Sequence, residues 1–324
     1  MTCITPLRRT LLLAAATLPL CAFAADYPTR PVEWVVPYAA GGGTDVVARV
    51  LSEPMGKTLG QPLIITNKPG AATNIGADAV ARAKPDGYML LTGDTGTLAA
   101  NPYLYTKLSY SAEKDFAPVG LLVRFPMLLV VNSKLPINNY ADFVKWVKAE
   151  PGGASYGTPG AGSPHHLATE LLRGHDKLDF VHVAYRGSAP AVQDVIGGTL
   201  PFMFVDTAAG IQHVQGGKIR AIAVASPKRL PTLPDVATLD EQGVKGFEAF
   251  AWQGIVAPKG TPAEVITKVN QALQGALNDA PTKAKLEAMG LEITPSTPQQ
   301  MDDYARAERT KWSQVIKANG IVLD

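Results

Sequence analysis

The segment Gly153–Gly157 reads Gly-Ala-Ser-Tyr-Gly and matches G-x-S-x-G, the pattern that in hydrolases holds a nucleophilic serine between a strand and a helix. Here Pro151-Gly152 precedes the pattern and Thr158-Pro159 follows it, so the flanking sequence does not favour a preceding strand or a following helix. We interpret the segment as a turn that leads into a short strand. An exported serine hydrolase that uses Ser155 stays the less favoured alternative.

The histidines, cysteines and glycine motifs of the chain form no catalytic or metal-binding pattern. No H-E-x-x-H pair and no G-x-G-x-x-G run occurs, and adjacent histidines point to different faces of a helix. Both cysteines, Cys3 and Cys21, lie in the first 24 residues, which excludes a thiol nucleophile or a cysteine-ligated metal in the rest of the chain. We therefore expect no enzyme, no metal and no cofactor. The histidines are His165, His166, His175, His182 and His213.

Four segments place a glycine-rich loop between an expected strand and the start of an expected helix. Glycine lets the backbone approach a ligand closely, and the first turn of a helix has unpaired N–H groups with a partial positive charge. Such loops bind carboxylate or phosphate without a basic side chain. Each loop alone could be a mere connection, but several in one chain without a catalytic motif favour anion binding. The segments are Tyr38–Asp45, Gly70–Ile75, Thr158–Ser163 and Arg186–Ser188.

The elements that must position these loops alternate between short apolar runs and helical patterns, which indicates α/β units on a mostly parallel sheet. Pro54 is expected to kink or shorten the first helix, and Gly174 to end the helix that Ser163-Pro164 begins. Capping boxes are expected at Thr261 and Thr297. Expected strands are Val32–Val36, Leu63–Thr66, Tyr88–Thr92, Met127–Val131 and Pro201–Val205, and expected helices span about 45–59, 75–83, 139–149, 164–174, 188–197 and 298–319.

Residues 1–24 resemble a secretory signal peptide. Arg8 and Arg9 precede the apolar run Leu11–Leu20, and Ala22-Phe23-Ala24 offers a cleavage site near Ala24. The run is shorter than the ~20 apolar residues that span a bilayer. We therefore expect an exported, periplasmic protein.

Charge and length restrict the partners of the exported chain. The 324 residues contain 30 Lys and Arg and 28 Asp and Glu, so removing Arg8 and Arg9 leaves 28 residues of each sign. A general nucleic-acid or anionic-membrane binder should be clearly basic, so both classes are excluded. The length suggests two domains.

Eight short segments, spread in order along the chain, resemble the Bug proteins, which are the periplasmic receptors of tripartite tricarboxylate transporters. Ala72-Thr73 and Ala184 depart from the residues that are frequent in that family, and the loop Thr95–Thr97 is variable in it, so the resemblance leaves the identity of the ligand open. The segments are Pro37–Asp45, Asn67–Ala71, Lys84–Tyr88, Asn101–Tyr105, Asp115–Val119, Gly157–Ser163, Tyr185–Gly187 and Ala257–Pro262.

The resemblance implies an α/β, two-lobed periplasmic-binding-protein fold of the type II kind, in which each lobe is a mostly parallel sheet flanked by helices. The expected first lobe is 25–126, the second lobe is 127–226, and residues 227–324 return to the first lobe.

The ligand is expected between the lobes, held by backbone groups and bridging waters. Several of the side chains have a structural alternative: Asp45, Ser163 and Asp206 could cap helices, and His166 could pack against Tyr185. The ligand contacts that the resemblance implies are Tyr38, Ala39, Ala40, Gly41, Asp45, Thr158, Gly162, Ser163, His166, Tyr185 and Asp206.

These observations predict a monomeric solute-binding protein that captures a small organic carboxylate and delivers it to an integral-membrane permease. An extracytoplasmic sensor that passes a ligand signal to a membrane kinase needs the same site, so the sequence leaves that alternative open.

Overall fold

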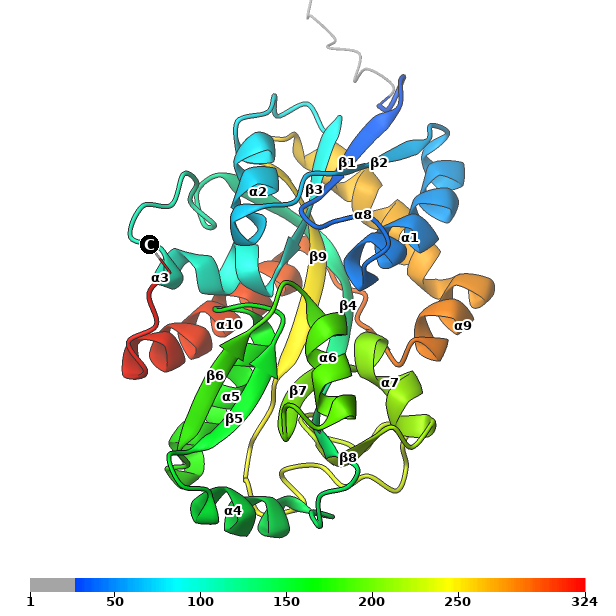
Figure 1. The fold of residues 1–324 in the computed structure, drawn as a ribbon. Coiled ribbons are helices and arrows are strands. Elements are labelled where there is room, and N and C mark those ends of the chain that lie inside the picture. The colour runs from blue at the N-terminus through cyan, green and yellow to red at the C-terminus, as the bar shows by residue number, and fades with distance from the viewer. Residues whose placement is uncertain (1–26, 324) are drawn as a thin grey trace, which may run out of the picture.

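One long strand, β4 (Phe116–Asn132), runs through both halves of the protein in the computed structural model, which describes residues 27–323 (Figure 1). Residues Phe116–Pro126 of β4 pair with β9 (Phe250–Pro258) in the first sheet, and residues Met127–Asn132 pair with strands of the second sheet. The expected signal peptide lies outside the described residues. None of the helices within 27–323 is long and apolar enough to cross a membrane.

The other elements divide between two lobes, the first drawn above the second in Figure 1. Strands of the first lobe are β1 (Val32–Val36), β2 (Leu63–Asn67), β3 (Met89–Asp94) and β10 (Glu292–Ile293); its helices are α1 (Gly43–Leu59), α2 (Asn74–Ala81), α3 (Asn101–Leu104), α8 (Ala263–Asn278), α9 (Ala280–Ala288) and α10 (Pro298–Ala318). A 3₁₀ turn spans Ala71–Thr73, and a π-helical segment spans Thr95–Ala100. Strands of the second lobe are β5 (Ala154–Thr158), β6 (Phe180–Ala184), β7 (Phe202–Asp206) and β8 (Ile219–Val224); its helices are α4 (Tyr140–Ala149), α5 (Pro164–Asp176), α6 (Ser188–Gly197) and α7 (Thr207–Gln215).

The strand directions make the carboxyl ends of both sheets face each other. β3 and β4 are each antiparallel to β9, so β1, β3 and β4 run in the same direction, toward the second lobe. β7 is antiparallel to β4, and β5 and β6 run parallel to β7, so these three strands end facing the first lobe. Ligands of α/β proteins bind at the carboxyl ends of strands, which indicates the junction between the lobes as the site.

Each sheet is mixed rather than mostly parallel. The expected parallel pairs are present as β2-β1-β3 and β6-β5-β7. The crossing strands β4 and β9 are antiparallel, because a chain that leaves a lobe and comes back must run in opposite directions at the two crossings.

The chain returns to the first sheet later than expected. Residues 227–249 stay with the second lobe: Leu230 and Leu233 pack in its core, and the ring of Phe247 stacks on that of Phe204 at 6.0 Å. The second crossing therefore begins at Phe250, and not near residue 226.

The expected end of α5 at Gly174 and the expected capping box at Thr261 are wrong, and α1 does not end early at Pro54. The cap at Ser163 and the capping box at Thr297 are confirmed. α1 continues through Pro54, because Val47, Leu51 and Met55 are buried along its inner face. α5 extends past Gly174 to Asp176, where the Leu178 amide bonds to the Arg173 carbonyl and closes the helix.

The Thr261 hydroxyl donates to the Pro258 carbonyl and leaves α8 without a side-chain cap. The Thr297 capping box is present on α10.

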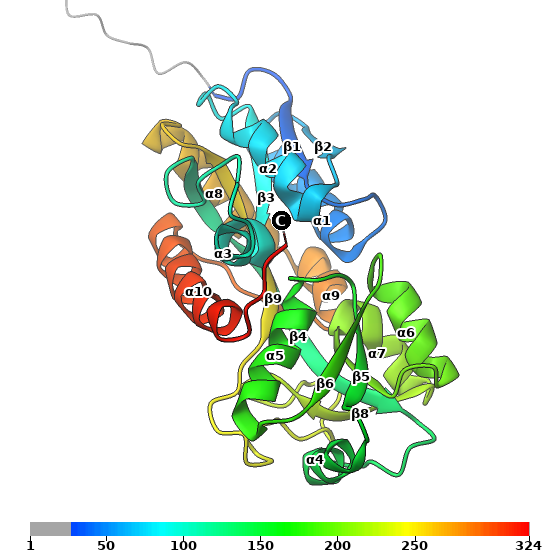
Figure 2. The ribbon, with the colours of Figure 1, turned by 60° about the vertical axis from the view of Figure 1, so that its left-hand side comes forward.

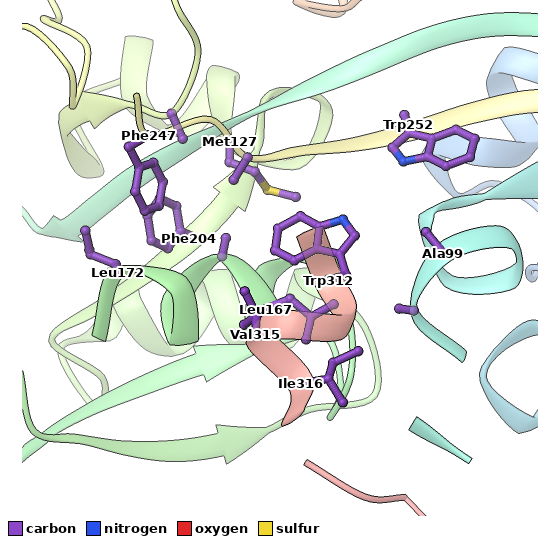
Figure 3. Packing of buried hydrophobic residues seen from close by; sticks show 14 of the residues in the cluster. Ala99, Met127, Leu167, Leu172, Phe204, Phe247, Trp252, Trp312, Val315 and Ile316 are labelled. Atoms are coloured by element: carbon purple, nitrogen blue, oxygen red, sulfur yellow. The ribbon is translucent and has the colours of Figure 1, made fainter. Parts of the chain in front are cut away.

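A single apolar cluster extends across both lobes. Trp312, Val315 and Ile316 of α10 face Leu167 of α5, as Figure 3 shows, although α10 belongs to the first lobe and α5 to the second. Figure 2 shows α10 lying alongside α5 from another side. This packing holds the two lobes against each other at one side of the crossing strands.

Candidate ligand-binding site between the lobes

Loops from both lobes meet where the parallel strands end. α1 follows β1 in the first lobe, and α5, α6 and α7 follow β5, β6 and β7 in the second, so four helix N-termini lie at the junction. Three of the four glycine-rich segments predicted from the sequence belong to this set. The fourth, Gly70–Ile75, leads from β2 to α2 in the first lobe.

The first loop, 37–42, is held by a network around Asp45 in the first turn of α1. One oxygen of Asp45 accepts the Gly41 amide at 2.9 Å and the Arg49 Nε at 2.9 Å, and the other accepts the Asn67 amide at 2.9 Å. Burial acts to raise the pKa of Asp45, but the hydrogen bonds from Arg49, Gly41 and Asn67 outweigh it and hold the pKa below its usual value. Asp45 therefore shapes the loop as an anion.

The Tyr38 side chain points toward the carboxyl end of strand β3 in the first lobe. Its hydroxyl donates to Asp94 at the end of β3, and its carbonyl accepts from Asn67 at 3.0 Å. Burial raises the pKa of Asp94, although hydrogen bonds from Tyr38 and Thr97 oppose the shift. The Tyr38 hydroxyl is thus already engaged, and what the residue leaves for a ligand is its ring and backbone.

The tip of the first loop offers free backbone donors. Ala39, Ala40 and Gly41 are exposed, and Gly41 has φ +83°, which suits glycine. Within the described residues, the amides of Ala39 and Ala40 have no hydrogen-bond acceptor, whereas the Gly41 amide is taken by Asp45 and Gly42 closes a turn over Ala40 and Gly41. Such a pair of donors beside a helix N-terminus can bind an anionic group.

The second loop, Thr158–Ser163, ends in a capped helix. The Ser163 hydroxyl accepts the His166 amide at 3.3 Å, so the expected cap on α5 is present. The Gly162 amide donates to Nδ1 of His166 at 3.0 Å. Both loops therefore share one design, in which a glycine with positive φ donates its amide to the side chain four residues further on.

His166 lies beneath the loop and stacks on His182, not on Tyr185 as one alternative held. The two imidazole rings are 4.1 Å apart and nearly parallel, and Nε2 of His182 lies 2.6 Å from the Thr158 hydroxyl oxygen. Burial, followed by the nearby His182 and Arg173, lowers the pKa of His166 to about 3. With Nδ1 already accepting from Gly162, the geometry gives His166 the role of supporting the loop.

Tyr185 and Asp206 complete the second-lobe side. The Tyr185 hydroxyl donates to Asp194, and burial followed by that contact raises the pKa of Tyr185 to about 12. Asp206 accepts the Ala209 amide at 3.0 Å and so caps α7, and its other oxygen lies 3.1 Å from Nε2 of His165. Burial acts to raise the pKa of Asp206, yet its hydrogen bonds keep the pKa low.

The lobes touch each other at the loops themselves. A Cβ built on Gly162 would lie 2.6 Å from Leu104 and 2.7 Å from Leu323, both in the first lobe. The Thr207 hydroxyl of α7 donates to the Gly290 carbonyl of the first lobe at 2.8 Å. Residues of the two lobes thus approach one another directly beside the second loop.

A cavity of about 810 Å³ also lies between the lobes, but away from these loops. It is lined by Arg124, by residues 228–232 of the segment held on the second lobe, and by residues 290–295 of the first lobe. None of the predicted contact residues lines it. The cavity therefore does not coincide with the site predicted at the convergent loops.

The chemistry of catalysis and of metal binding finds no support in residues 27–323. Ser155 lies inside strand β5 and not on a turn, as the interpretation of that segment as a short strand predicted. No group of three or more His, Cys, Asp or Glu side chains in the described residues could hold a metal ion.

Sequence reasoning missed three supporting residues: Asn67, Asp94 and His182. Asn67 begins one of the segments that carry the family resemblance, and Asp94 ends a strand at the binding edge, so both had a signal. His182 lies within β6, and only the folded structure brings its ring onto His166.

Comparisons with known proteins identify the family of this chain. The family model described as the tripartite tricarboxylate transporter family receptor matches residues 47–321. BugT of Bordetella pertussis is 34% identical, over 92% of this chain and 91% of that protein.

Two similar solved structures are matched over 100% of their own chains. Rpa4515 of R. palustris with adipate is 35% identical over 92% of this chain, with a TM-score of 0.85. MatC of Rhodopseudomonas palustris with bound malate is 34% identical over 90%, with a TM-score of 0.80. The family is one of binding receptors and not of enzymes, and this chain belongs to it: it is a tripartite tricarboxylate transporter receptor, as the resemblance to the Bug proteins predicted.

Proposed function

We propose that this receptor captures a small organic carboxylate between its two lobes, in the periplasm, and delivers it as a monomer to the integral-membrane permease of its transporter. The observation that carries the proposal is the pair of unused backbone amides on the first loop, Ala39 and Ala40, opposite the helix N-termini of the second lobe. Backbone donors at helix N-termini favour anions.

A carboxylate suits the electrostatics better than a sugar or a cation. Asp45 accepts the Gly41 amide of the first loop, and its charge is already balanced by Arg49 and by two amide donors. Asp94, the other carboxyl group that contacts this loop, accepts from the Tyr38 hydroxyl, and burial raises its pKa. The second loop is supported by a neutral imidazole, so it adds no charge of its own. Relatives whose structures contain adipate and malate support the same ligand class.

The proposed contacts fall into two kinds. Ala39 and Ala40 would present the free amides of the first loop, with the exposed Gly41 beside them, its amide held by Asp45. Ser163 would present the hydrogen of the hydroxyl whose oxygen caps α5. Tyr38, Asp45, Thr158, Gly162, His166, Tyr185 and Asp206 would shape the site, because each has a polar group committed to a protein partner.

A thermal-shift screen over mono-, di- and tricarboxylates tests the proposal. A ligand that binds only the folded protein raises its stability by RT ln(1 + [L]/Kd), so ligand at 100 times Kd adds about 2.7 kcal/mol. We expect at least one small carboxylate to raise the melting temperature by several degrees, with sugars and amines as controls. A screen in which no carboxylate stabilises the protein while a neutral solute does would contradict the proposed ligand class.

A further inference from the structure

The glycine-rich loop Thr158–Ser163 is held at both ends by one pair of stacked rings. His166 accepts the Gly162 amide at 3.0 Å near the end of the loop, and His182 lies 2.6 Å from the Thr158 hydroxyl oxygen at its start. The rings are 4.1 Å apart with an interplanar angle of 9°. Because the two histidines come from α5 and β6, they tie the loop to two separate elements.

The pair can do this only while His166 is neutral. Nδ1 of His166 must carry a lone pair to accept from Gly162, and a proton there would set one donor against another. A second positive charge on the stacked His182 would add electrostatic repulsion. Burial is the larger cause and neighbouring charges the smaller cause of the lowered pKa of both rings.

The other groups around the pair leave little to stabilise an added proton. Glu170 lies 3.8 Å from Nε2 of His166, but that same oxygen already accepts from the Tyr156 hydroxyl at 2.7 Å. The other Glu170 oxygen lies 3.0 Å from the Arg173 guanidinium. Tyr156 also faces both imidazole rings. The carboxylate and the guanidinium balance each other, so protonation of the pair would leave a net positive charge in a buried cluster.

We propose that His166 and His182 are positioning residues, which do not touch the ligand but hold Thr158–Ser163 in the shape that binds a carboxylate. This inference rests on the function proposed above. It replaces a direct contact between His166 and ligand with an indirect role through the Gly162 amide.

Three variants at one position separate the roles. His166→Asn places an amide oxygen where Nδ1 stood and cannot be protonated near neutral pH, so it restores the acceptor. His166→Leu removes the acceptor and leaves the buried Gly162 amide unpaired. His175→Asn is the matched control, because His175 lies on the exposed end of the same helix and contacts Asp176.

The first measurement needs no ligand. A through-hydrogen-bond ¹⁵N–¹⁵N coupling between the Gly162 amide and Nδ1 of His166 is expected in the wild type at pH 7.5. Amide shifts of residues 158–163 should change in His166→Leu and stay close to wild type in His166→Asn and His175→Asn. Absence of the coupling, or loop shifts that do not respond to His166→Leu, would overturn the proposal. The wild-type coupling tests the bond between His166 and the loop even if His166→Leu does not fold.

The second measurement is calorimetric titration with malate and with adipate at pH 7.5. We expect His166→Leu to bind the accepted carboxylate about tenfold or more weakly, the size expected when a buried donor is left unpaired. His166→Asn should recover most of that loss, and His175→Asn should match the wild type. Equal affinity of His166→Leu and the wild type, or a loss that His166→Asn does not recover, would overturn the positioning role.

The two measurements also separate this inference from the proposed function. If the wild type binds no carboxylate, the proposed ligand class fails, while the coupling and the loop shifts still show whether His166 holds the loop.

Discussion

Replacing Gly162 by alanine tests whether the contact between the lobes belongs to the ligand-binding state. Gly162 has φ +73°, and a Cβ there would meet Leu104 at 2.6 Å and Leu323 at 2.7 Å. The backbone strain costs about 1–2 kcal/mol, as for other L-residues in the left-handed region. The added methyl group also overpacks against two leucines of the other lobe, which costs about 1–3 kcal/mol more.

Gly60→Ala is the matched control for the strain. Gly60 has φ +72°, ends α1 and has nothing within 4 Å of a built Cβ. Both variants should therefore lose about 1–2 kcal/mol of stability from φ alone. Only Gly162→Ala should lose the further 1–3 kcal/mol where the lobes meet. If the liganded state needs this contact, the loss corresponds to a factor of about 5 to 150 in affinity.

The assay is urea unfolding for stability and titration calorimetry for affinity, with the carboxylate identified by the thermal-shift screen. We expect Gly60→Ala to lower the free energy of unfolding and to leave Kd unchanged, whereas Gly162→Ala lowers both stability and affinity. Gly162→Ala with the same Kd as Gly60→Ala would refute the reasoning, because the lobes would then bind ligand without this close approach.

Three further predictions follow from the same contacts. Ser163→Ala removes the cap on α5 and should lose about 1 kcal/mol of stability, and the control Thr297→Ala should lose a similar amount on α10. Only Ser163→Ala should also lower the affinity for the ligand. An unchanged Kd would show that Ser163 acts only as a helix cap. The pKa of His166 falls from 6.5 to about 3 on folding, so the unfolded state binds the extra proton as the pH falls. The stability is therefore full above pH 6.5 and drops by about 2 kcal/mol from pH 6.5 to 5. Urea melts of His166→Asn should show a shallower decline with falling pH than those of the wild type, and equal slopes would contradict the assignment. Small-angle scattering should show a smaller radius of gyration at saturating ligand, since a ligand that touches both lobes favours the closed form; an unchanged radius would indicate a rigid pocket.

Local signals in the sequence were enough to place the loops. The run Val32–Val36 is followed, after four residues, by Gly41–Gly43, and glycine permits the positive φ that Gly41 adopts. Ser163-Pro164 marks a helix start because a hydroxyl cap and a proline at the first helical position are both local features. Both loops therefore fall at the junction between the lobes, as the strand directions require.

Features that depend on distant residues could not be predicted in this way. The excursion of residues 227–249 over the second lobe depends on pockets such as the one where Phe247 meets Phe204, which have no local pattern. The stack of His166 on His182 likewise joins a helix to a strand. Propensity rules also fail at Pro54, where packing of the buried face of α1 outweighs the lost hydrogen bond.

The central claim is that backbone donors between the lobes select a carboxylate. Calorimetric titration of the wild type with malate and adipate, each beside its diamide, tests this claim most directly, because the diamides keep the shape and remove the charge. We predict saturable binding of at least one acid at one site per chain and no detectable binding of its diamide. Equal affinity for the acid and the diamide would contradict the account.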